Sequence, residues 1–237
     1  MSDLFAKSAL QPLAERMRPR RLADMVGQDR LLSKEAALRK AIESGRIHSM
    51  ILWGPPGCGK TTLALLVAQY AKARFISISA VMSGLPEVRK VLVEAEQHFL
   101  RGEATVLFVD EVHRFNKVQQ DAFLPYIEKG SIVFIGATTE NPSFELNSAL
   151  LSRCRVHVMD AVSVEAIERA LGLALADREN GLAASIVISD AQLHSIAQAA
   201  DGEGVGNVGE LRTQVTLRLA LVGAQAREHG GDGFADS

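Results

Sequence analysis

The feature that most constrains this chain is a glycine-rich octapeptide that lies between an apolar run and a helical pattern. The pattern G-x-x-x-x-G-K-S/T is matched by Gly54-Pro55-Pro56-Gly57-Cys58-Gly59-Lys60-Thr61. It follows the apolar run 50–53 and opens a helical pattern over 60–71. Glycines let backbone N–H groups converge on phosphate oxygens, and the N-terminus of the helix adds partial positive charge. The sequence therefore predicts a nucleotide-binding loop between a strand and a helix.

The side chains of this loop have distinct expected roles. We expect Lys60 to reach the β- and γ-phosphates and the Thr61 hydroxyl to coordinate Mg²⁺. Cys58 is either a reactive thiol, because helix N-termini lower thiol pKa values, or the occupant of a variable loop position, which we favour. The residues expected to contact the nucleotide are Gly54, Pro55, Pro56, Gly57, Cys58, Gly59, Lys60, Thr61, Thr62 and Asp110.

An acidic pair, Asp110-Glu111, ends the apolar run 106–109. Open α/β sheets bind their ligands at the carboxyl ends of the strands, so this pair is expected beside the glycine-rich loop. We expect Asp110 to hold Mg²⁺, through water, and Glu111 to polarise the attacking water. Beside a phosphate loop, we favour this interpretation over a solvated acidic turn.

Two further polar positions are candidates on weaker grounds. The run 132–135 ends in Gly136-Ala137-Thr138-Thr139, where a hydroxyl would lie next to the acidic pair and sense the γ-phosphate. Arg153 precedes the last apolar run. It is either a solvated surface arginine or an arginine finger that completes the site of a neighbouring subunit.

Apolar runs alternate with helical patterns through the first two thirds of the chain. Short buried strands that alternate with helices indicate βαβ crossovers and a parallel sheet. We predict strands over 50–53, 75–78, 106–109, 132–135 and 156–159, with helices over 31–43, 60–71, 86–100 and 118–128. The expected domains are an irregular N-terminal arm (1–25), an α/β core (26–160), a small helical domain (161–229, with helices over 164–179, 191–200 and 208–228 and a hint of a strand over 186–188) and a flexible tail (230–237).

Charge and cysteine content exclude several classes of protein. With 26 basic and 28 acidic residues the net charge is −2, so the chain does not hold nucleic acid by bulk charge. Two distant cysteines, Cys58 and Cys154, exclude a disulfide framework and a four-cysteine zinc site. Neither an apolar run long enough to span a bilayer nor the apolar region of a secretory signal is seen. We therefore expect a soluble cytoplasmic protein.

Five runs of sequence carry a resemblance to a known family. The chain resembles AAA+ ATPases and, among them, the replication-associated recombination protein A family, over residues from about 12 to about 200. The runs that carry it are LAERMRP (13–19), VGQ (26–28), HSMILWGPPG (48–57), FVDEVHRFNK (108–117) and FIGATTENPSFELN (134–147).

The resemblance implies a fold and roles for individual residues. The fold would be a P-loop ATPase core followed by a helical lid, with ATP and Mg²⁺ as cofactors. The segments Arg18-Pro19 and Val26-Gly27-Gln28 would line the adenine pocket, largely by backbone and apolar contact. The resemblance makes Lys60 and Thr61 the Walker A pair, Asp110 and Glu111 the Walker B pair, Thr139 or its neighbour Thr138 sensor 1, and Arg153 the arginine finger.

The resemblance also implies an activity. The family is similar to clamp-loader subunits and the RuvB motor, and acts on DNA at stalled replication forks. DNA forks, single strands or ends, single-strand-binding protein and other replication proteins are therefore the expected partners. We expect an Mg²⁺-dependent, DNA-stimulated ATPase that remodels DNA or DNA-bound proteins. The alternative is a nucleotide-binding regulatory subunit that hydrolyses ATP poorly and docks to another ATPase.

Two departures from the family pattern favour that alternative. The segment 201–211 has no arginine where the sensor 2 arginine is expected, although Arg212 lies one helical turn later and could substitute. The family continues after its lid with a helical oligomerisation region, which this sequence does not include. An arginine finger at Arg153 needs a neighbour, so we expect the chain to assemble through its ATPase faces, to borrow a longer partner or to be a shortened paralogue.

Basic residues near two of the runs are candidates for DNA contact. Arg114 and Lys117, just after the acidic pair, either face a central channel and touch phosphates or lie in a solvated loop. The arginines at 16, 18, 20 and 21 are equally ambiguous, and no aromatic residues interleave with them to stack on bases.

Overall fold

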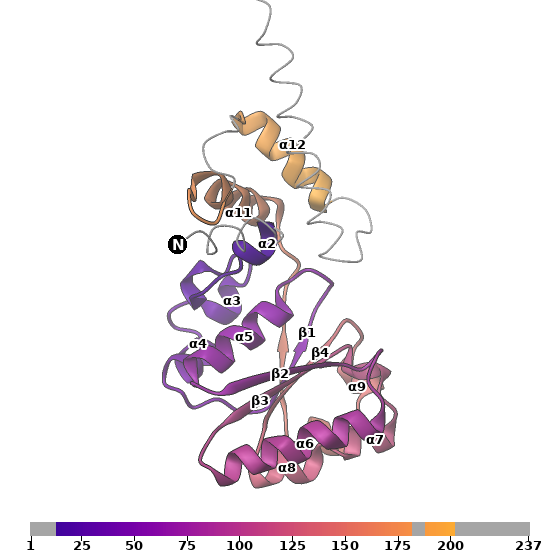
Figure 1. The fold of residues 1–237 in the computed structure, drawn as a ribbon. Helices are drawn as coiled ribbons and strands as arrows, with labels where there is room; N and C mark the ends of the chain where they lie inside the picture. Colours follow the sequence, from indigo (N-terminus) through magenta and orange to yellow (C-terminus); the bar gives the residue numbers. More distant parts are fainter. Residues whose placement is uncertain (1–12, 182–187, 202–237) are drawn as a thin grey trace, which may run out of the picture. The chain divides into compact units, whose positions relative to one another are not determined.

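The computed structural model describes residues 13–181 and 188–201. The chain divides into two compact units, one of which is the continuous segment Pro19–Ala161. The other combines the residues before it with those from Val162 onward, and its described part is helical. Figure 1 shows the sheet and its flanking helices in the first unit and helices α2, α11 and α12 in the second.

The first unit contains a five-stranded sheet in the order β2-β3-β4-β1-β5. Every neighbouring pair of strands is parallel, which confirms the predicted fold class. All of the predicted strands are present: the bounds of β1 are as predicted, and those of the other four differ by one to three residues. They are β1 (Met50–Trp53), β2 (Arg74–Ser79), β3 (Thr105–Asp110), β4 (Val133–Thr138) and β5 (Arg155–Val158).

Helices cover both faces of the sheet (Figure 1). Alternation along β3 separates two apolar clusters: Phe108 packs with Leu63 and Leu66 of α5, whereas Leu107 packs with Leu92 of α6. Burial on both faces explains why the sequence of β3 is continuously apolar. The helices of this unit are α3 (Asp29–Leu32), α4 (Ala37–Glu43), α5 (Lys60–Tyr70), α6 (Leu85–Leu100), α7 (Lys117–Asp121), α8 (Leu124–Lys129), α9 (Pro142–Glu145) and α10 (Ser148–Leu151), with 3-10 turns at Leu22–Asp24 and Val112–Arg114.

The single helix predicted over 31–43 is wrong, because the chain forms α3 and α4 with a short turn between them, in which the Ala36 N–H donates to the Ser33 carbonyl at 3.0 Å. Leu32 and Leu38 are both buried in one cluster. Six residues of continuous helix would place them about 120° apart around its axis. The break between Ser33 and Ala36 lets the two side chains reach the same core.

The helix predicted over 118–128 is also two helices, α7 and α8. Pro125 lies in the first turn of α8, where a missing N–H costs nothing, but inside a longer helix it would remove a hydrogen bond and clash with the preceding turn. The expected irregular arm is wrong in detail as well. It includes the short helix α2 (Leu13–Arg16) and the 3-10 turn Leu22–Asp24.

The described part of the second unit centres on α11 (Val164–Ala176) and α12 (Asp190–Asp201), which pack through Leu171, Ile196 and Ala197. The helix predicted over 164–179 ends early, because the Asp177 side chain caps the following turn by accepting from the backbone N–H of Glu179. No described helix is long and apolar enough to cross a bilayer. The helix expected over 208–228, the segment 201–211 apart from Asp201, Arg212, the tail and most of 186–188 lie outside the described residues.

Candidate functional site

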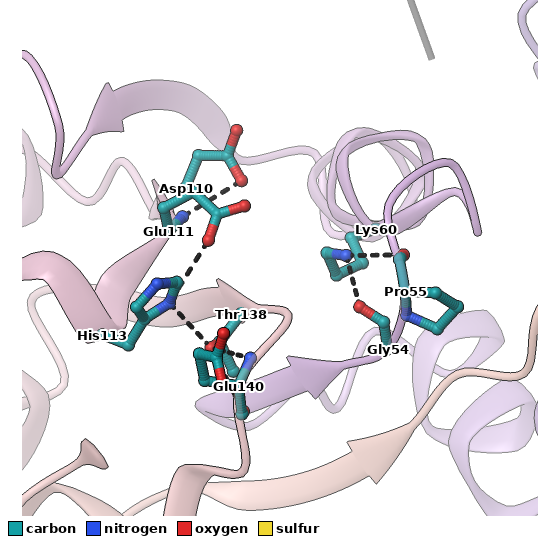
Figure 2. A network of polar contacts seen from close by, with 8 residues as sticks. All are labelled: Gly54, Pro55, Lys60, Asp110, Glu111, His113, Thr138 and Glu140. Carbon is teal, nitrogen blue, oxygen red and sulfur yellow. Dashed lines mark hydrogen bonds and ion pairs between the residues drawn. The ribbon is translucent and has the colours of Figure 1, made fainter. Parts of the chain in front are cut away.

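The predicted site residues gather where three neighbouring strands end. Strand β1 ends at Trp53, β3 at Asp110 and β4 at Thr138. Because the strands are parallel and adjacent, their carboxyl ends meet at one edge of the sheet. The loop 54–59, the acidic pair and the threonine pair therefore lie along this edge. Figure 2 shows Gly54, Pro55, Asp110, Glu111 and Thr138 of this set.

Two glycines let the loop adopt its backbone path. Gly59 has φ 96°, in the left-handed region that side chains rarely allow, and it immediately precedes helix α5. A Cβ on Gly54 would lie 2.5 Å from the carbonyl oxygen of Met159. The Gly54 N–H donates to the Thr138 carbonyl at 3.1 Å, so the loop begins as a direct extension of the sheet.

Lys60 crosses the loop from the first turn of α5 (Figure 2). Its buried Nζ donates to the carbonyl oxygens of Gly54 at 2.7 Å and Pro55 at 2.9 Å. Its third contact is a weak one, to Cys58 Sγ at 4.0 Å. Thr61 and Thr62 follow it, half-buried, in the same helical turn.

The acidic pair lies beside the loop. Asp110 is the last residue of β3 and alternates with Phe108, which places it on the face covered by α5. Its Oδ1 accepts from the Glu111 N–H at 3.1 Å. Glu111 has φ 52°, and its Oε2 lies 3.2 Å from Nδ1 of His113.

The two threonines have different surroundings. Thr138 is fully buried, and its Oγ1 contacts Nδ1 of His113 at 2.9 Å and accepts from the Glu140 N–H at 3.0 Å. Thr139 is half-buried and follows the end of β4. By alternation, Thr138 belongs with Phe134 on the face away from α5, so Thr139 is the better placed of the two for a ligand at the glycine-rich loop.

Arg153 is not part of this cluster. It precedes β5, so it lies at the amino ends of the parallel strands, whereas the glycine-rich loop lies at their carboxyl ends. Its Nε donates to Glu128 Oε1 at 2.7 Å and its Nη1 to the Ala149 carbonyl at 2.8 Å. The arrangement does not bring Arg153 to the loop of its own chain.

The sequence analysis missed the role of two side chains, Gln28 and His113. Gln28 is fully buried, and its Nε2 donates to the carbonyl oxygens of Cys58 at 3.2 Å and Asp160 at 2.8 Å. We had expected this segment to act through backbone and apolar contact. The signal available was an amide within a segment expected to be buried, since a buried amide needs partners.

The two cysteines are buried and free. Burial raises the pKa of the Cys58 thiol, although the nearby Lys60 ammonium opposes this shift. Burial also raises the pKa of Cys154 to about 12. A raised pKa disfavours the nucleophilic thiolate, so the structure favours the loop-filling interpretation of Cys58 over the reactive one.

The described residues offer ligands for a nucleotide-bound metal but no dedicated metal cluster. Within 13–181 and 188–201, no three His, Cys, Asp or Glu side chains are grouped to hold a metal. Mg²⁺ at nucleotide sites uses one or two protein oxygens together with phosphates and water, so Thr61 and Asp110 suit that kind of site.

Two candidate DNA contacts, Arg114 and Lys117, are exposed. Arg18 and Arg21 each pair with an acidic residue three positions away, which lowers the net charge of the arm.

Comparisons with known proteins agree with this arrangement. Residues 50–160 match the family described as "ATPase family associated with various cellular activities (AAA)". Replication-associated recombination protein A of Escherichia coli (strain K12) is 55% identical over 207 residues, 86% of this chain and 46% of that protein. The ATPase WRNIP1 of Dictyostelium discoideum is 44% identical over 84% of this chain and 23% of its own length.

A solved structure shares the fold. The RuvB Holliday junction branch migration motor of Thermotoga maritima aligns with a TM-score of 0.65 and 27% sequence identity, over 85% of this chain and 64% of that one. The chain spans less than half the length of the curated relatives named above. The sequence matches and the P-loop fold together show that the chain belongs to the replication-associated recombination protein A family of AAA+ ATPases.

Proposed function

We propose that this chain binds and hydrolyses ATP and acts in the cytoplasm in replication-fork maintenance, recombination and repair. The observation that carries the proposal is the convergence of the Lys60 ammonium, the Asp110-Glu111 pair and Thr139 at one edge of the sheet. Asp110 and Thr139 lie at the ends of β3 and β4, and Lys60 follows the loop after β1, so together these groups can surround the terminal phosphate of a nucleotide.

Each residue has a proposed task in hydrolysis. The N–H groups of 57–62 and the Lys60 ammonium bind phosphate oxygens, and Thr139 contacts the γ-phosphate. Glu111 accepts a proton from the attacking water. The hydroxyl of Thr61 and the carboxylate of Asp110 are hard oxygen donors, which suits Mg²⁺. When bound, Mg²⁺ neutralises charge that develops on the phosphate oxygens.

One proposed feature goes beyond a single copy of the site. We assign Arg153 to the ATP of a neighbouring subunit, because it lies at the edge of the sheet away from its own loop. Assembly would then run through the ATPase faces.

We further propose that 26–160 is the ATPase core and 161–229 the lid, and the division between Ala161 and Val162 supports this boundary.

DNA and its binding proteins are the proposed partners. The names of the relatives, a recombination protein and a branch migration motor, support DNA forks, single strands or ends, with single-strand-binding protein and other replication proteins. Exposed Arg114 and Lys117 are the candidate phosphate contacts. Removal of one such contact should weaken binding to all sequences and lower the salt slope by about one unit.

An ATPase assay with and without forked DNA, run beside light scattering for mass, tests this proposal. We expect turnover that DNA stimulates and that Glu111→Gln abolishes while ATP binding persists. Tight ATP binding without turnover would instead select the regulatory subunit, which the missing sensor 2 arginine in 201–211 favours. Turnover that persists in Arg212→Ala would show that Arg212 does not serve as the replacement.

A further inference from the structure

His113 lies between two residues at the ends of neighbouring strands, Glu111 after β3 and Thr138 in β4. Its Nδ1 is 3.2 Å from Glu111 Oε2 on one side and 2.9 Å from Thr138 Oγ1 on the other (Figure 2). The His113 side chain is 7% exposed, whereas that of Glu111 is 32% exposed. The imidazole is therefore buried, whereas the carboxylate that it contacts remains partly accessible to solvent.

The local backbone brings these two side chains together. Glu111 has φ 52° and ψ 45°, a left-handed conformation that residues with a side chain adopt rarely. The turn starts the 3-10 helix Val112–Arg114, closed by the Arg114 N–H donating to the Glu111 carbonyl at 2.9 Å. Val112 is fully buried and anchors this helix against the sheet. Unfavourable backbone geometry that is held in place by surrounding packing is typical of functional sites.

The contacts determine which ring nitrogen carries the proton. Thr138 Oγ1 accepts from the Glu140 N–H and lies 3.3 Å from the Glu140 carbonyl, to which it can donate its single proton. Nδ1 then donates to Thr138 Oγ1. A bare Nδ1 would instead turn its lone pair toward the Glu111 carboxylate, which is repulsive. Both contacts of Nδ1 are satisfied together only when Nδ1 is protonated.

We propose that His113 is a positioning residue for Glu111 and links it to strand β4. The Nδ1–H holds Oε2 of the carboxylate and leaves Oε1 for the water that hydrolysis consumes. The same ring contacts Thr138, the residue directly before the proposed sensor Thr139. This inference rests on the proposed ATPase function, and it gives His113 no proton transfer of its own.

Three substitutions at His113 separate positioning from a merely structural role. His113→Asn retains an N–H near the position of Nδ1, His113→Gln carries its N–H near the position of Nε2, and His113→Ala has neither. We expect kcat to fall about 10- to 100-fold in the Ala and Gln variants and to stay within about threefold in the Asn variant. The Kd of a fluorescent ATP analogue should change by less than about twofold in all three, because His113 does not contact the phosphate loop.

The proposal is overturned if His113→Ala keeps the full kcat, if Asn is no better than Gln, or if ATP binding falls in parallel with kcat. A long-range ¹H–¹⁵N spectrum of the neutral His113 ring in the unsubstituted chain is an independent test that needs no variant to fold. A proton on Nδ1 supports the proposal, and a neutral ring protonated on Nε2 overturns it. Absence of any turnover that depends on Glu111 would refute the ATPase function, whereas Glu111-dependent turnover that ignores His113 would refute this inference alone.

Discussion

The side-chain amide of Gln28 forms two hydrogen bonds to the backbone of Asp160, 132 positions further along the chain. Its Oε1 accepts from the Asp160 N–H at 3.2 Å, and its Nε2 donates to the Asp160 carbonyl at 2.8 Å and to the Cys58 carbonyl at 3.2 Å. One amide thus joins the start of α3, the glycine-rich loop and a residue two positions after the end of β5. The bond to the Cys58 carbonyl is buried and the two bonds to Asp160 are partly buried.

Gln28→Ala is expected to lower the free energy of unfolding by about 2–3 kcal/mol, because it leaves the buried Cys58 carbonyl and two partly buried backbone groups of Asp160 without this partner. Chemical denaturation followed by circular dichroism measures this change. Gln97→Ala, at an exposed position in α6, is the matched control and should change stability by less than about 0.5 kcal/mol. Equal effects in the two variants would contradict the role of Gln28.

Arg153→Ala is expected to reduce ATP turnover at least about tenfold while nucleotide affinity stays unchanged. The reason is its place at the edge of the sheet away from its own glycine-rich loop. Steady-state turnover and analogue binding measure the two quantities. Mixing Arg153→Ala chains with Lys60→Ala chains should restore part of the activity, because an assembly then contains an intact loop facing an intact arginine. No recovery on mixing would argue against action on a neighbour.

Glu128→Gln is expected to leave the fold nearly unchanged, because the Glu128–Arg153 pair lies at the surface and exposed ion pairs contribute about 0–1 kcal/mol. Thermal unfolding should therefore shift by no more than about 4 °C. A larger loss of stability would mean that the pair supports helix α8 rather than holding a mobile guanidinium in place.

Stability should fall as the pH is lowered from about 6.5 to about 4 because of His157. Burial, with smaller effects of His48 and Arg155, lowers the pKa of His157 from 6.5 to about 4. In this interval His157 is protonated in the unfolded chain and neutral in the folded chain, so the free energy of unfolding falls as the pH falls. Allowing for partial exposure of the ring, the loss is about 1–2 kcal/mol.

Thermal unfolding of the unsubstituted chain and of His157→Gln between pH 4 and 8 tests this. The variant should show a flatter profile below pH 6.5 and a constant offset above it. Identical slopes for the two proteins would show that His157 does not titrate with a lowered pKa.

Both thiols are expected to resist a disulfide reagent at pH 7 in the folded chain and to react fully in denaturant. Burial raises the pKa of each, and each side chain is enclosed by the core. Counting released thiolate by absorbance measures this, with Cys154→Ala used to isolate Cys58. Rapid labelling of Cys58 in the folded protein would restore the reactive interpretation.

Local patterns in the sequence were sufficient to predict the strands, the glycine-rich loop and the acidic pair. The run 106–109 is apolar at every position because both faces of β3 are covered, and this pattern is readable without a structure. The two helix breaks were missed, although Pro125 and the six-residue spacing of Leu32 and Leu38 are signals for them. A local reading weighs helical spacing over a window and smooths over a single interruption.

By itself, the sequence determined the fold class and which residues could meet a nucleotide, because strand, turn and helix preferences act over a few neighbouring residues. Only the tertiary structure decided how those residues are supported. His113 meets Thr138 25 positions away, Gln28 meets Asp160 132 positions away and Arg153 meets Glu128 25 positions away. Such partners depend on which strand ends lie side by side and on which buried polar groups must be satisfied there. Packing of the whole sheet determines both, and no local window of the chain contains that information.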